Sequence, residues 1–407
     1  MNVLIVGGGA AGLMAAGAAG RQGHTVTVVE RNPRPARKVM ITGKGRCNVT
    51  NNCSIDTFIQ QVPENARFLY SALNAFTPQD TMALIESMGV PLKTERGNRV
   101  FPVSDKAVDI VDALVKYAKE GGARFVEGRV TELVVAEGVC AGVKLENGTV
   151  LTADRVIVAT GGCSYPGTGS TGDGYTLARQ AGHTVIEPRP SLVALNSPDL
   201  FCADMQGLSL KNCGLQVRDN EKQKIIYSDL GEMLFTHFGV SGPMVLSASA
   251  HMRQMAAGRY TLIIDWKPGL TPEQLDARIL RDFAERSNMD LANALGKLLP
   301  RLLIPVMLEL CQVKPVKKCH AVTREERLRL VKGIKAMPVE IDGFRPLSEA
   351  IVTAGGVSVK EINAKTMESK LLPGLYFAGE VLDVDAYTGG FNLQIAFSTG
   401  MAAGNAE

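Results

Sequence analysis

The sequence predicts an α/β protein in which a Rossmann-like dinucleotide-binding domain with a β-meander is interrupted by an inserted β-rich domain with a small helical part. Three observations predict this fold: a strand, glycine turn, helix and strand at residues 1–30, alternating apolar and polar residues at 128–152, and a change of character after residue 188. We expect the first domain to comprise residues 1–188 and 351–407. The inserted domain, expected to bind substrate, then spans residues 189–350, with its helical part at about 271–335.

Composition and charge limit the possible functions. The chain has 407 residues, 45% hydrophobic and 21% charged, as expected for a globular enzyme of two or three domains. The net charge of +3 is too small to attract DNA or a membrane through a general field. The eight cysteines form no Cys-x-x-Cys pair and no ligand set with histidine, so we expect no metal site and reduced thiols in a cytoplasmic protein. Glycines interrupt the uncharged first twenty residues, which argues against a signal peptide or a membrane span.

A dinucleotide-binding unit is the clearest feature of the N-terminus. The segment NVLIVGGGAAGLMAAGAAGRQGHTVTVVE predicts a buried strand at Val3–Val6, a small-residue helix, and a second strand that ends at Glu30. In the Gly-x-Gly-x-x-Gly motif, Gly7 allows a tight turn, Gly9 lets the backbone approach a pyrophosphate, and Gly12 lets helix and strand pack closely. The carboxylate that ends the second strand is placed to accept hydrogen bonds from ribose hydroxyls.

Two later segments complete this domain. Short alternating strands separated by turns at Glu137-Gly138 and Asn147-Gly148 predict a β-meander, and they precede a buried strand at Val156–Ala159. Near the C-terminus, GLYFAGEVLDVDAYTGGFNLQ predicts another buried strand, a glycine turn at Gly389-Gly390, and a helix from about Leu393. These elements return the chain to the first domain.

The insert mixes strands and helices. Short apolar runs such as RYTLIID predict strands, whereas TPEQLDARILRDFAERS and DLANALGKLLPRLLIPVMLEL have helical spacing. The first of these predicted helices has Thr271 as its cap and Pro272 in its first turn. An insert between two halves of a domain creates a crevice, which is a favoured position for a substrate pocket.

A second Gly-x-Gly-x-x-Gly motif occupies residues 167–172. It lies between the strand that ends at Thr160 and a predicted helix that ends at Gly182, as a nucleotide-binding motif would. The intervening CSYP segment, which ends at Pro166, removes the tight strand, turn and helix geometry. We therefore favour a loop that lines the active-site cleft. Contact with a nicotinamide nucleotide and a plain linker are the alternatives.

Several motifs together give the chain a family resemblance. The N-terminal glycine motif with Glu30, the strand VIVATGG and the segment GLYFAGEVLDV…GGFN resemble flavoproteins with two dinucleotide-binding domains. The segments GKGRCNVTN, LFTHFGVSGPMVL and TAGGV narrow the resemblance to the BaiN/YhiN-like family of FAD-dependent oxidoreductases, over essentially the whole chain. The resemblance implies an FAD-binding domain of the GR2 type, with FAD in the first site. It also implies NADH or NADPH as a transient reductant.

The resemblance also implies where FAD binds. The ADP half is expected beside the first glycine motif, Glu30 and Arg31, with Val130 contacting adenine through its backbone. The flavin end is expected beside Glu380 and the start of the last helix, whose free N–H groups suit ring or ribityl oxygens. The full expected cofactor-binding set is Gly7, Gly9, Ala11, Gly12, Glu30, Arg31, Arg37, Lys38, Gly43, Gly45, Arg46, Cys47, Asn48, Val130, Thr160, Gly161, Gly379, Glu380, Asp383, Gly390, Phe391, Asn392 and Leu393.

Cations follow the predicted ribose-binding strand closely. Arg37, Lys38, Lys44 and Arg46 lie among glycines and would surround the pyrophosphate or the reduced, anionic flavin. A solvated basic loop is the alternative.

Two residues are candidates for the proton donor that a flavin reductase needs. Cys47 lies in GKGRCNVTNNC, and its ordinary pKa of about 8.5 keeps it mostly protonated, although Lys44 and Arg46 would favour the thiolate. A structural thiol is the alternative for Cys47. His237 lies in FTHFGVSGP, and a packed turn histidine is the alternative to an acid near the cleft.

The segment from Lys314 to Lys335 gathers Lys and Arg around two Glu. Such a segment could bind RNA or an anionic substrate. A solvated helix face is favoured, because the segment lacks aromatic side chains for base stacking.

The expected function is an FAD-dependent oxidoreductase that acts on a small molecule. We rank NAD(P)H-dependent reduction of an activated C=C bond first, such as an enone of an oxo-bile acid, because the ending YTGGFN is nearer the BaiN type than the GGYN type. The alternatives are reduction of uridine in ribosomal RNA, oxidation of an aminoacetone-type amine, and a flavin-binding scaffold without activity. The absence of Cys-x-x-Cys argues against a disulfide reductase.

Overall fold

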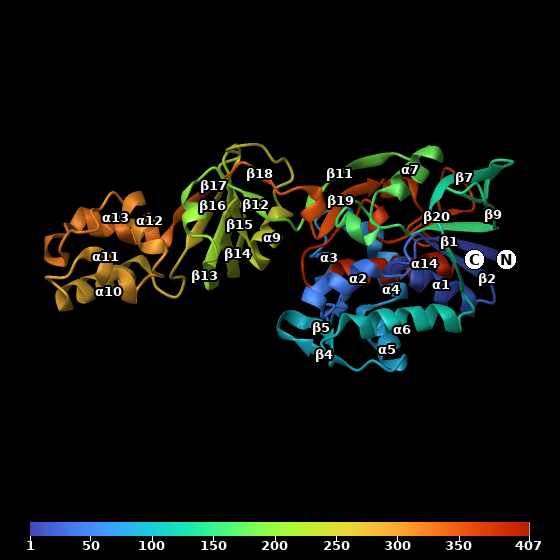
Figure 1. Cartoon of the computed structure of the whole chain (residues 1–407), viewed down its shortest axis with the longest axis horizontal. Coiled ribbons are helices and arrows are strands. Elements are labelled where there is room, and N and C mark those ends of the chain that lie inside the picture. Colours follow the sequence, from blue (N-terminus) through green and yellow to red (C-terminus); the bar gives the residue numbers. More distant parts are fainter. Residues whose placement is uncertain (407) are drawn as a thin grey trace. The chain divides into compact units, whose positions relative to one another are not determined.

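A computed structural model describes residues 1–406, which form two compact units (Figure 1). Unit 1 comprises residues 1–191 and 346–407, and unit 2 comprises residues 192–345. These boundaries differ slightly from the expected 188 and 350. Strand β11 (Val185–Ser191) stays paired with β19 (Val352–Val357) as far as Ser191. The segment after residue 345 belongs to unit 1, where Ser348 O accepts a hydrogen bond from Tyr165 N.

The centre of unit 1 is a five-stranded parallel sheet in the order β20-β10-β1-β2-β6. Its strands are β1 (Asn2–Val6), β2 (Thr25–Glu30), β6 (Arg124–Glu127), β10 (Arg155–Val158) and β20 (Leu375–Phe377). The predicted βαβ unit is confirmed, because α1 (Ala10–Arg21) connects β1 and β2 and these strands pair in parallel.

Smaller elements surround this sheet. The predicted meander is confirmed as β7 (Val130–Ala136), β8 (Val139–Leu145) and β9 (Val150–Thr152), which pair antiparallel. A second small sheet contains β3 (Thr50–Asn51), β4 (Leu92–Glu95) and β5 (Arg99–Pro102). The other helices of unit 1 are α2 (Arg37–Ile41), α3 (Ile55–Ile59), α4 (Tyr70–Ala75), α5 (Pro78–Ser87), α6 (Ala107–Glu120), α7 (Asp173–Gln180) and α14 (Phe391–Gly404).

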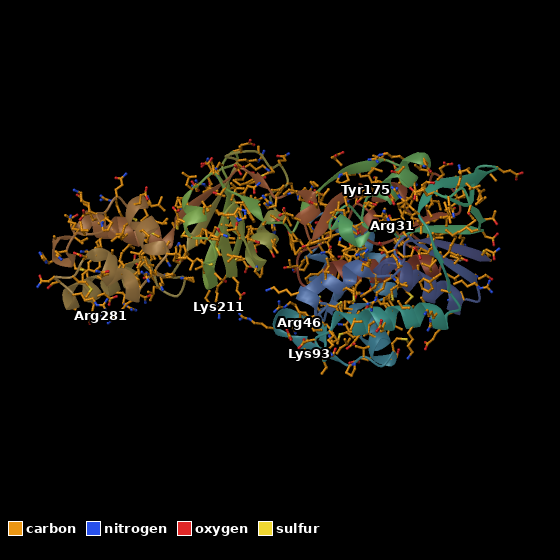
Figure 2. All side chains as sticks on the ribbon, in the orientation of Figure 1. Arg31, Arg46, Lys93, Tyr175, Lys211 and Arg281 are labelled. Carbon is orange, nitrogen blue, oxygen red and sulfur yellow. The ribbon has the colours of Figure 1, made fainter. Side chains whose placement is uncertain are left out.

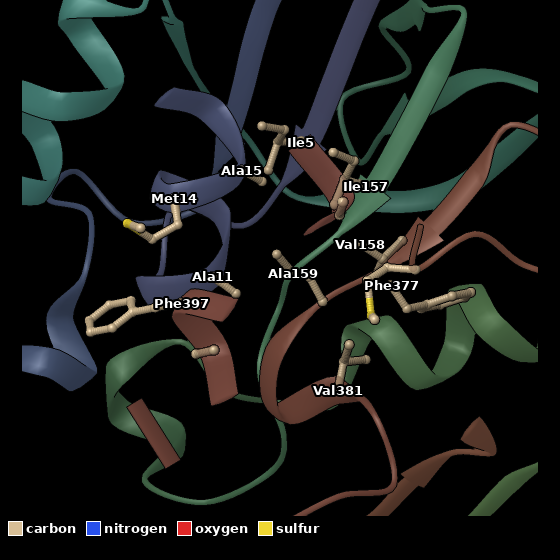
Figure 3. Packing of buried hydrophobic residues seen from close by; sticks show 14 of the residues in the cluster. Ile5, Ala11, Met14, Ala15, Ile157, Val158, Ala159, Phe377, Val381 and Phe397 are labelled. Carbon is tan, nitrogen blue, oxygen red and sulfur yellow. The ribbon is translucent and has the colours of Figure 1, made fainter. Parts of the chain in front are cut away.

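The core of unit 1 joins the sheet to α1 and α14. Ile5 of β1, Ile157 of β10 and Phe377 of β20 are fully buried in one apolar cluster. Ala11, Met14 and Ala15 of α1 and Phe397 of α14 belong to the same cluster (Figure 3). The last helix is therefore built into the N-terminal half of the domain.

Unit 2 is built on a seven-stranded antiparallel sheet in the order β17-β16-β13-β14-β15-β12-β18. Its strands are β12 (Leu195–Asn196), β13 (Ser209–Asp219), β14 (Lys224–Thr236), β15 (Gly239–Ser241), β16 (Tyr260–Asp265), β17 (Met337–Ile341) and β18 (Gly343–Phe344). Its helices are α8 (Phe201–Asp204), α9 (Pro243–Ser249), α10 (Pro272–Glu285), α11 (Leu291–Ala294), α12 (Leu303–Leu310) and α13 (Arg324–Lys335).

The predicted cap of α10 is confirmed, because the Thr271 side chain accepts a hydrogen bond from Gln274 N. The predicted helix over DLANALGKLLPRLLIPVMLEL is instead divided into α11, a short 3-10 turn and α12. Pro300 lies between the two helices, where its ring and missing N–H interrupt a continuous helix. Within residues 1–406, no helix combines the length and apolar character needed to cross a bilayer.

A buried polar cluster links three turns of unit 1. His183 Nδ1 lies 3.0 Å from Glu361 Oε2, and its Nε2 lies 2.7 Å from Ser369 Oγ. The Ser369 oxygen already accepts the N–H groups of Leu371 and Leu372, so its proton points to Nε2. His183 is therefore a neutral imidazole that donates from Nδ1 to Glu361.

We expect this cluster to make stability depend on pH. Burial lowers the pKa of His183 below the ordinary 6.5, although Glu361 opposes the change. The unfolded chain therefore takes up the proton first, so the stabilisation is complete above about pH 6.5 and is lost as the pH falls below it. Urea denaturation of the wild type at about pH 7.5 and about pH 5.5 should give a smaller free energy of unfolding at the lower pH.

The matched control is His183→Asn, which keeps a donor for Glu361 but does not titrate. It should show a weaker loss of stability over the same pH interval. An equal loss in both proteins would contradict a role for His183.

Candidate dinucleotide site

The first glycine motif forms a tight turn at the C-terminal end of β1. A Cβ added at Gly7, whose φ is +103°, would lie 2.6 Å from Ala159 O, and a Cβ at Gly12 would overlap the Gly7 carbonyl. The tight turn and the close helix packing predicted for Gly7 and Gly12 are thus visible in the backbone. Gly9 precedes α1, and no side chain caps this helix within residues 1–406. The N–H groups of its first turn are available to phosphate oxygens.

Glu30 turns its carboxylate towards this glycine loop. Its Oε2 accepts the Gly8 N–H at 2.7 Å. Its Oε1 accepts hydrogen bonds from the backbone N–H and from Nδ2 of Asn32, each at 2.8 Å. Asn32 was not among the expected site residues. The carboxylate is held beside the glycine turn, as a ligand of an adenosine ribose requires.

Lys38 and Glu380 form the central ion pair of the site. The Lys38 ammonium lies 2.7 Å from Glu380 Oε2 and 2.6 Å from Ser164 Oγ. Glu380 Oε1 also accepts the N–H of Thr353 at 2.9 Å. The two charged side chains are only 23% and 20% exposed, so Lys38 is not a solvated surface cation. Sequence reasoning missed Ser164 and Thr353, although both lie within or beside motifs of the family resemblance.

The start of α14 lies against the loop that begins with Gly43. Asn51 Nδ2 donates a 3.0 Å hydrogen bond to Gly389 O, and Thr50 Oγ1 donates one to Gln394. Among residues 1–406 no side chain caps α14, so the N–H groups around Phe391 and Leu393 are free for a ligand. The Asn392 side chain instead bonds the backbone of Ala386, so only its backbone N–H is available to a cofactor.

Several cations expected around the cofactor have protein partners. Arg46 pairs with Glu95 and Asp105, and its guanidinium lies 4.1 Å from the centre of the Phe101 ring. Lys93 joins this cluster through a 2.8 Å contact with Asp105 (Figure 2). These contacts hold the loop that contains Gly43, Lys44, Gly45 and Cys47, all of which have positive φ.

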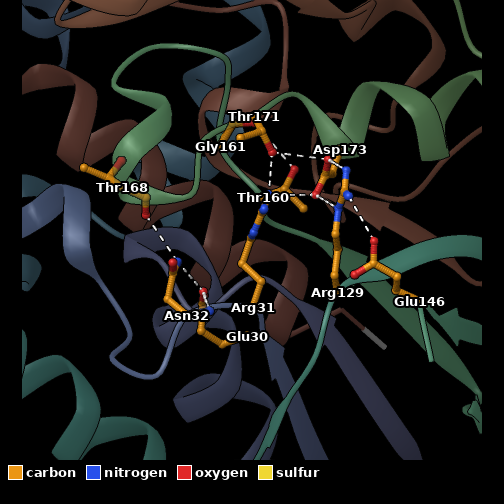
Figure 4. A network of polar contacts seen from close by, with 10 residues as sticks. All are labelled: Glu30, Arg31, Asn32, Arg129, Glu146, Thr160, Gly161, Thr168, Thr171 and Asp173. Atoms are coloured by element: carbon orange, nitrogen blue, oxygen red, sulfur yellow. Dashed lines mark hydrogen bonds and ion pairs between the residues drawn. The ribbon is translucent and has the colours of Figure 1, made fainter.

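Two further expected ligands also bond protein groups. Arg37 donates to Asn32 Oδ1, and Arg31 bonds Thr171 and Asp173 (Figure 4). In contrast, the Lys44 side chain is exposed. The expected set of cations therefore does not converge on one point.

Cys47 lies in the core of unit 1 with no exposed surface. Burial raises the pKa of the Cys47 thiol to about 12, although a hydrogen bond with Thr42 opposes the change. Arg46 does not favour the thiolate as expected, because its guanidinium pairs with Glu95 and Asp105. The thiol remains protonated at neutral pH, and its surroundings match the structural alternative.

His237 lies in unit 2, in the turn between β14 and β15. Its ring is exposed and packs edge to face on Phe238, with 5.1 Å between ring centroids. The residue therefore has the ring packing of a turn histidine and the exposure that an acid needs.

Most of the remaining expected residues follow strands of the parallel sheet in the sequence. Val130 begins β7 and is buried, and Thr160 and Gly161 follow β10 near Arg31 (Figure 4). Asp383 accepts a 3.0 Å hydrogen bond from Asn65, and burial raises the pKa of its carboxyl. Asn48 Oδ1 is buried and has no hydrogen-bond partner among residues 1–406, so it can accept one from a ligand or a water molecule.

The basic segment at 314–335 is partly paired with carboxylates of unit 2. Lys317 pairs with Glu326, Lys318 with Asp290, Arg327 with Asp276 and Lys335 with Asp265, at 2.6–2.8 Å. Arg329 donates to the carbonyl of Cys311. Four of the eight Lys and Arg side chains of the segment are thus paired with carboxylates, which reduces its positive charge.

The Lys38 ion pair predicts a change in FAD affinity. Lys38→Met leaves the half-buried Glu380 carboxylate without its cation, which disturbs its orientation. We expect the Kd for FAD, measured by flavin fluorescence quenching, to rise about ten-fold. Lys44→Met, at an exposed position in the 3-10 turn that follows α2, is the control and should leave the Kd unchanged. Equal Kd values for the two variants would contradict a role for the Lys38–Glu380 ion pair in FAD binding.

Burial of Cys47 predicts an unreactive thiol. Cys47→Ser should retain turnover within about two-fold, because a group with a pKa of about 12 does not supply the proton at neutral pH. In the folded wild type, iodoacetamide should leave Cys47 unmodified, as read by peptide mass spectrometry. A severe loss of turnover in a well-folded Cys47→Ser protein would restore the thiol as a catalytic candidate.

Comparison with known proteins supports a redox enzyme. The chain is 32% identical over 412 residues to the 3-dehydro-bile acid delta(4,6)-reductase of Clostridium scindens, covering 99% of this chain and 98% of the relative. It is 30% identical over 416 residues to the ribosomal RNA dihydrouridine synthase of Escherichia coli, covering 98% and 96%.

The fold is also similar to that of a solved dehydrogenase structure. The 3-ketosteroid-delta4-(5alpha)-dehydrogenase of Rhodococcus jostii aligns with a TM-score of 0.51 at 16% identity, covering 99% of this chain and 96% of that one, and it supports the fold alone. The family model for the HI0933-like protein Rossmann domain matches residues 1–406. The chain therefore belongs to the HI0933-like family, which confirms the resemblance and the expected class, an FAD-dependent oxidoreductase.

Proposed function

We propose that the protein uses NADH or NADPH to reduce an activated C=C bond in a small molecule. Bound FAD would take up a hydride from the nicotinamide and pass it to the substrate. In the overall reaction one alkene carbon gains this hydride and its neighbour gains a proton, while NAD(P)H becomes NAD(P)⁺. The full-length relationship to a bile acid reductase supports this reaction type.

The residues of unit 1 fit FAD. The free first turn of α1 would hold the pyrophosphate, and Glu30 would bind the adenosine ribose. Glu380, oriented by Lys38, would bind the ribityl side, and the first turn of α14 would face the ring oxygens. These residues hold and orient the cofactor. Of the two candidate proton donors, Cys47 is buried and His237 is exposed.

The ion pairs within the basic segment favour a small substrate over RNA. A protein that binds RNA needs several cations free to contact phosphates. At 314–335 four cations pair with carboxylates of the same unit, and a fifth bonds a carbonyl. Reduction of uridine in ribosomal RNA is the second candidate. The chain is similar over nearly its full length to the Escherichia coli relative, which is named a ribosomal RNA dihydrouridine synthase.

An anaerobic reoxidation panel tests the proposal. The purified, FAD-loaded protein is first bleached with NADH or NADPH without oxygen. Separate samples then receive a conjugated steroid enone, uridine-containing ribosomal RNA or aminoacetone, and the return of flavin absorbance is followed. We expect rapid reoxidation by the enone alone.

The other outcomes separate the alternatives. Reoxidation by RNA alone would establish the second candidate. Hydrogen peroxide production from aminoacetone without nicotinamide would overturn the reductase proposal. A separate variant, His237→Asn, tests this side chain as the proton donor: an altered pH profile of enone turnover would support the role, and an unchanged profile would exclude it.

A further inference from the structure

The second glycine motif does not form a nucleotide-binding turn. Fourteen residues, 159–172, separate β10 from α7, and they contain a 3-10 turn at Pro166–Thr168. Asp173 lies in the first turn of α7, so a carboxylate occupies the position where a pyrophosphate would bind. A pyrophosphate therefore meets a carboxylate rather than a free helix N-terminus at this motif. We call residues 161–173 the strap.

The strap is tied to the segment that follows β2. Arg31 Nη1 donates to Thr171 Oγ1 at 2.6 Å and contacts Asp173 Oδ2 at 3.1 Å (Figure 4). Arg129, at the entrance to β7, holds the same Asp173 with two hydrogen bonds of 2.9 and 3.1 Å. Nearer its beginning, the strap is tied through Ser164 Oγ, which accepts from Lys38 at 2.6 Å.

The middle of the strap reaches the ribose end of the dinucleotide site. Asn32 Nδ2 donates to Thr168 O at 3.3 Å, and the same nitrogen donates to Glu30 Oε1 at 2.8 Å. The carboxylate expected to bind the ribose is thus one side chain away from the strap. Gly169 has a φ of +106°, and a Cβ there would lie 2.5 Å from Asn32 Nδ2. Only a glycine permits this close approach.

We infer that the strap closes the adenosine side of the FAD site and retains the cofactor. Arg31 is then a positioning residue that anchors the strap, rather than a phosphate ligand. This inference rests on the proposed FAD site. FAD leaves only after the bonds from Arg31 and Asn32 to the strap have broken, so the strap lowers the dissociation rate of FAD without touching the reacting atoms.

Two glycines of the motif provide a matched test. Gly169→Ala places a methyl group against Asn32 and strains a left-handed residue, whereas Gly167→Ala meets nothing within 4 Å. The rate of FAD release is measured from the rise in flavin fluorescence after rapid dilution of the loaded protein. We expect release about ten-fold faster for Gly169→Ala, as for the loss of one charge-assisted hydrogen bond, and an unchanged rate for Gly167→Ala.

A second pair of variants avoids any backbone strain. Thr171→Val removes the hydroxyl that Arg31 bonds while keeping the shape, and Thr171→Ser restores the hydroxyl. Thr171→Val should release FAD faster, Thr171→Ser should restore the wild-type release rate, and the KM for NAD(P)H should be unchanged. This result would support FAD retention by the strap even if Gly169→Ala misfolds. Wild-type release rates for both Gly169→Ala and Thr171→Val would overturn it, and so would a raised KM for NAD(P)H with unchanged FAD release. A wild-type protein that takes up no FAD would instead overturn the FAD site itself.

Discussion

The close packing of α1 against α14 is the constraint on which the dinucleotide site depends. A Cβ at Gly400 would overlap the Ala11 carbonyl, and one at Gly404 would lie 2.5 Å from Ala15 O, so the two backbones nearly touch. Helices approach this closely only where side chains are minimal. The packing joins residues from opposite ends of the chain, and it fixes two uncapped helix N-termini in one unit. One suits a pyrophosphate and the other a flavin ring.

A layer of charged pairs lies at the edge of this apolar packing. Lys38 reaches Glu380 and Ser164, and Arg31 reaches Asp173, so each of these two cations has a partner more than a hundred residues away. Such partly buried pairs contribute more to orientation than to stability. Lys38 and Arg31 were expected to bind phosphate. In the structure Lys38 instead orients the Glu380 carboxylate, and Arg31 bonds the strap. The field that a cofactor meets is therefore set by helix ends and backbone N–H groups more than by free cations.

Burial decides which titratable groups remain available for chemistry. Cys47 and His183 are both sealed within unit 1, and in each case burial favours the neutral form. The first becomes a packed thiol and the second a neutral link between Glu361 and Ser369. His237 is exposed on unit 2. Burial thus argues against Cys47 as one of the two candidate proton donors, and the other, His237, is exposed.

Local features of the sequence determined the βαβ unit, the meander and the cap of α10. Gly12 meets the carbonyl of Gly7 and Thr271 caps through Gln274, so both act through neighbours a few residues away, and turn and capping geometry depend on such short spacings. Only the tertiary structure decided the partners of Arg46 and Lys38, the burial of Cys47 and the place of residues 167–172. A charged side chain pairs with whatever carboxylate the fold brings near it, and burial depends on distant segments. Neither quantity is encoded in the spacing of residues along the chain.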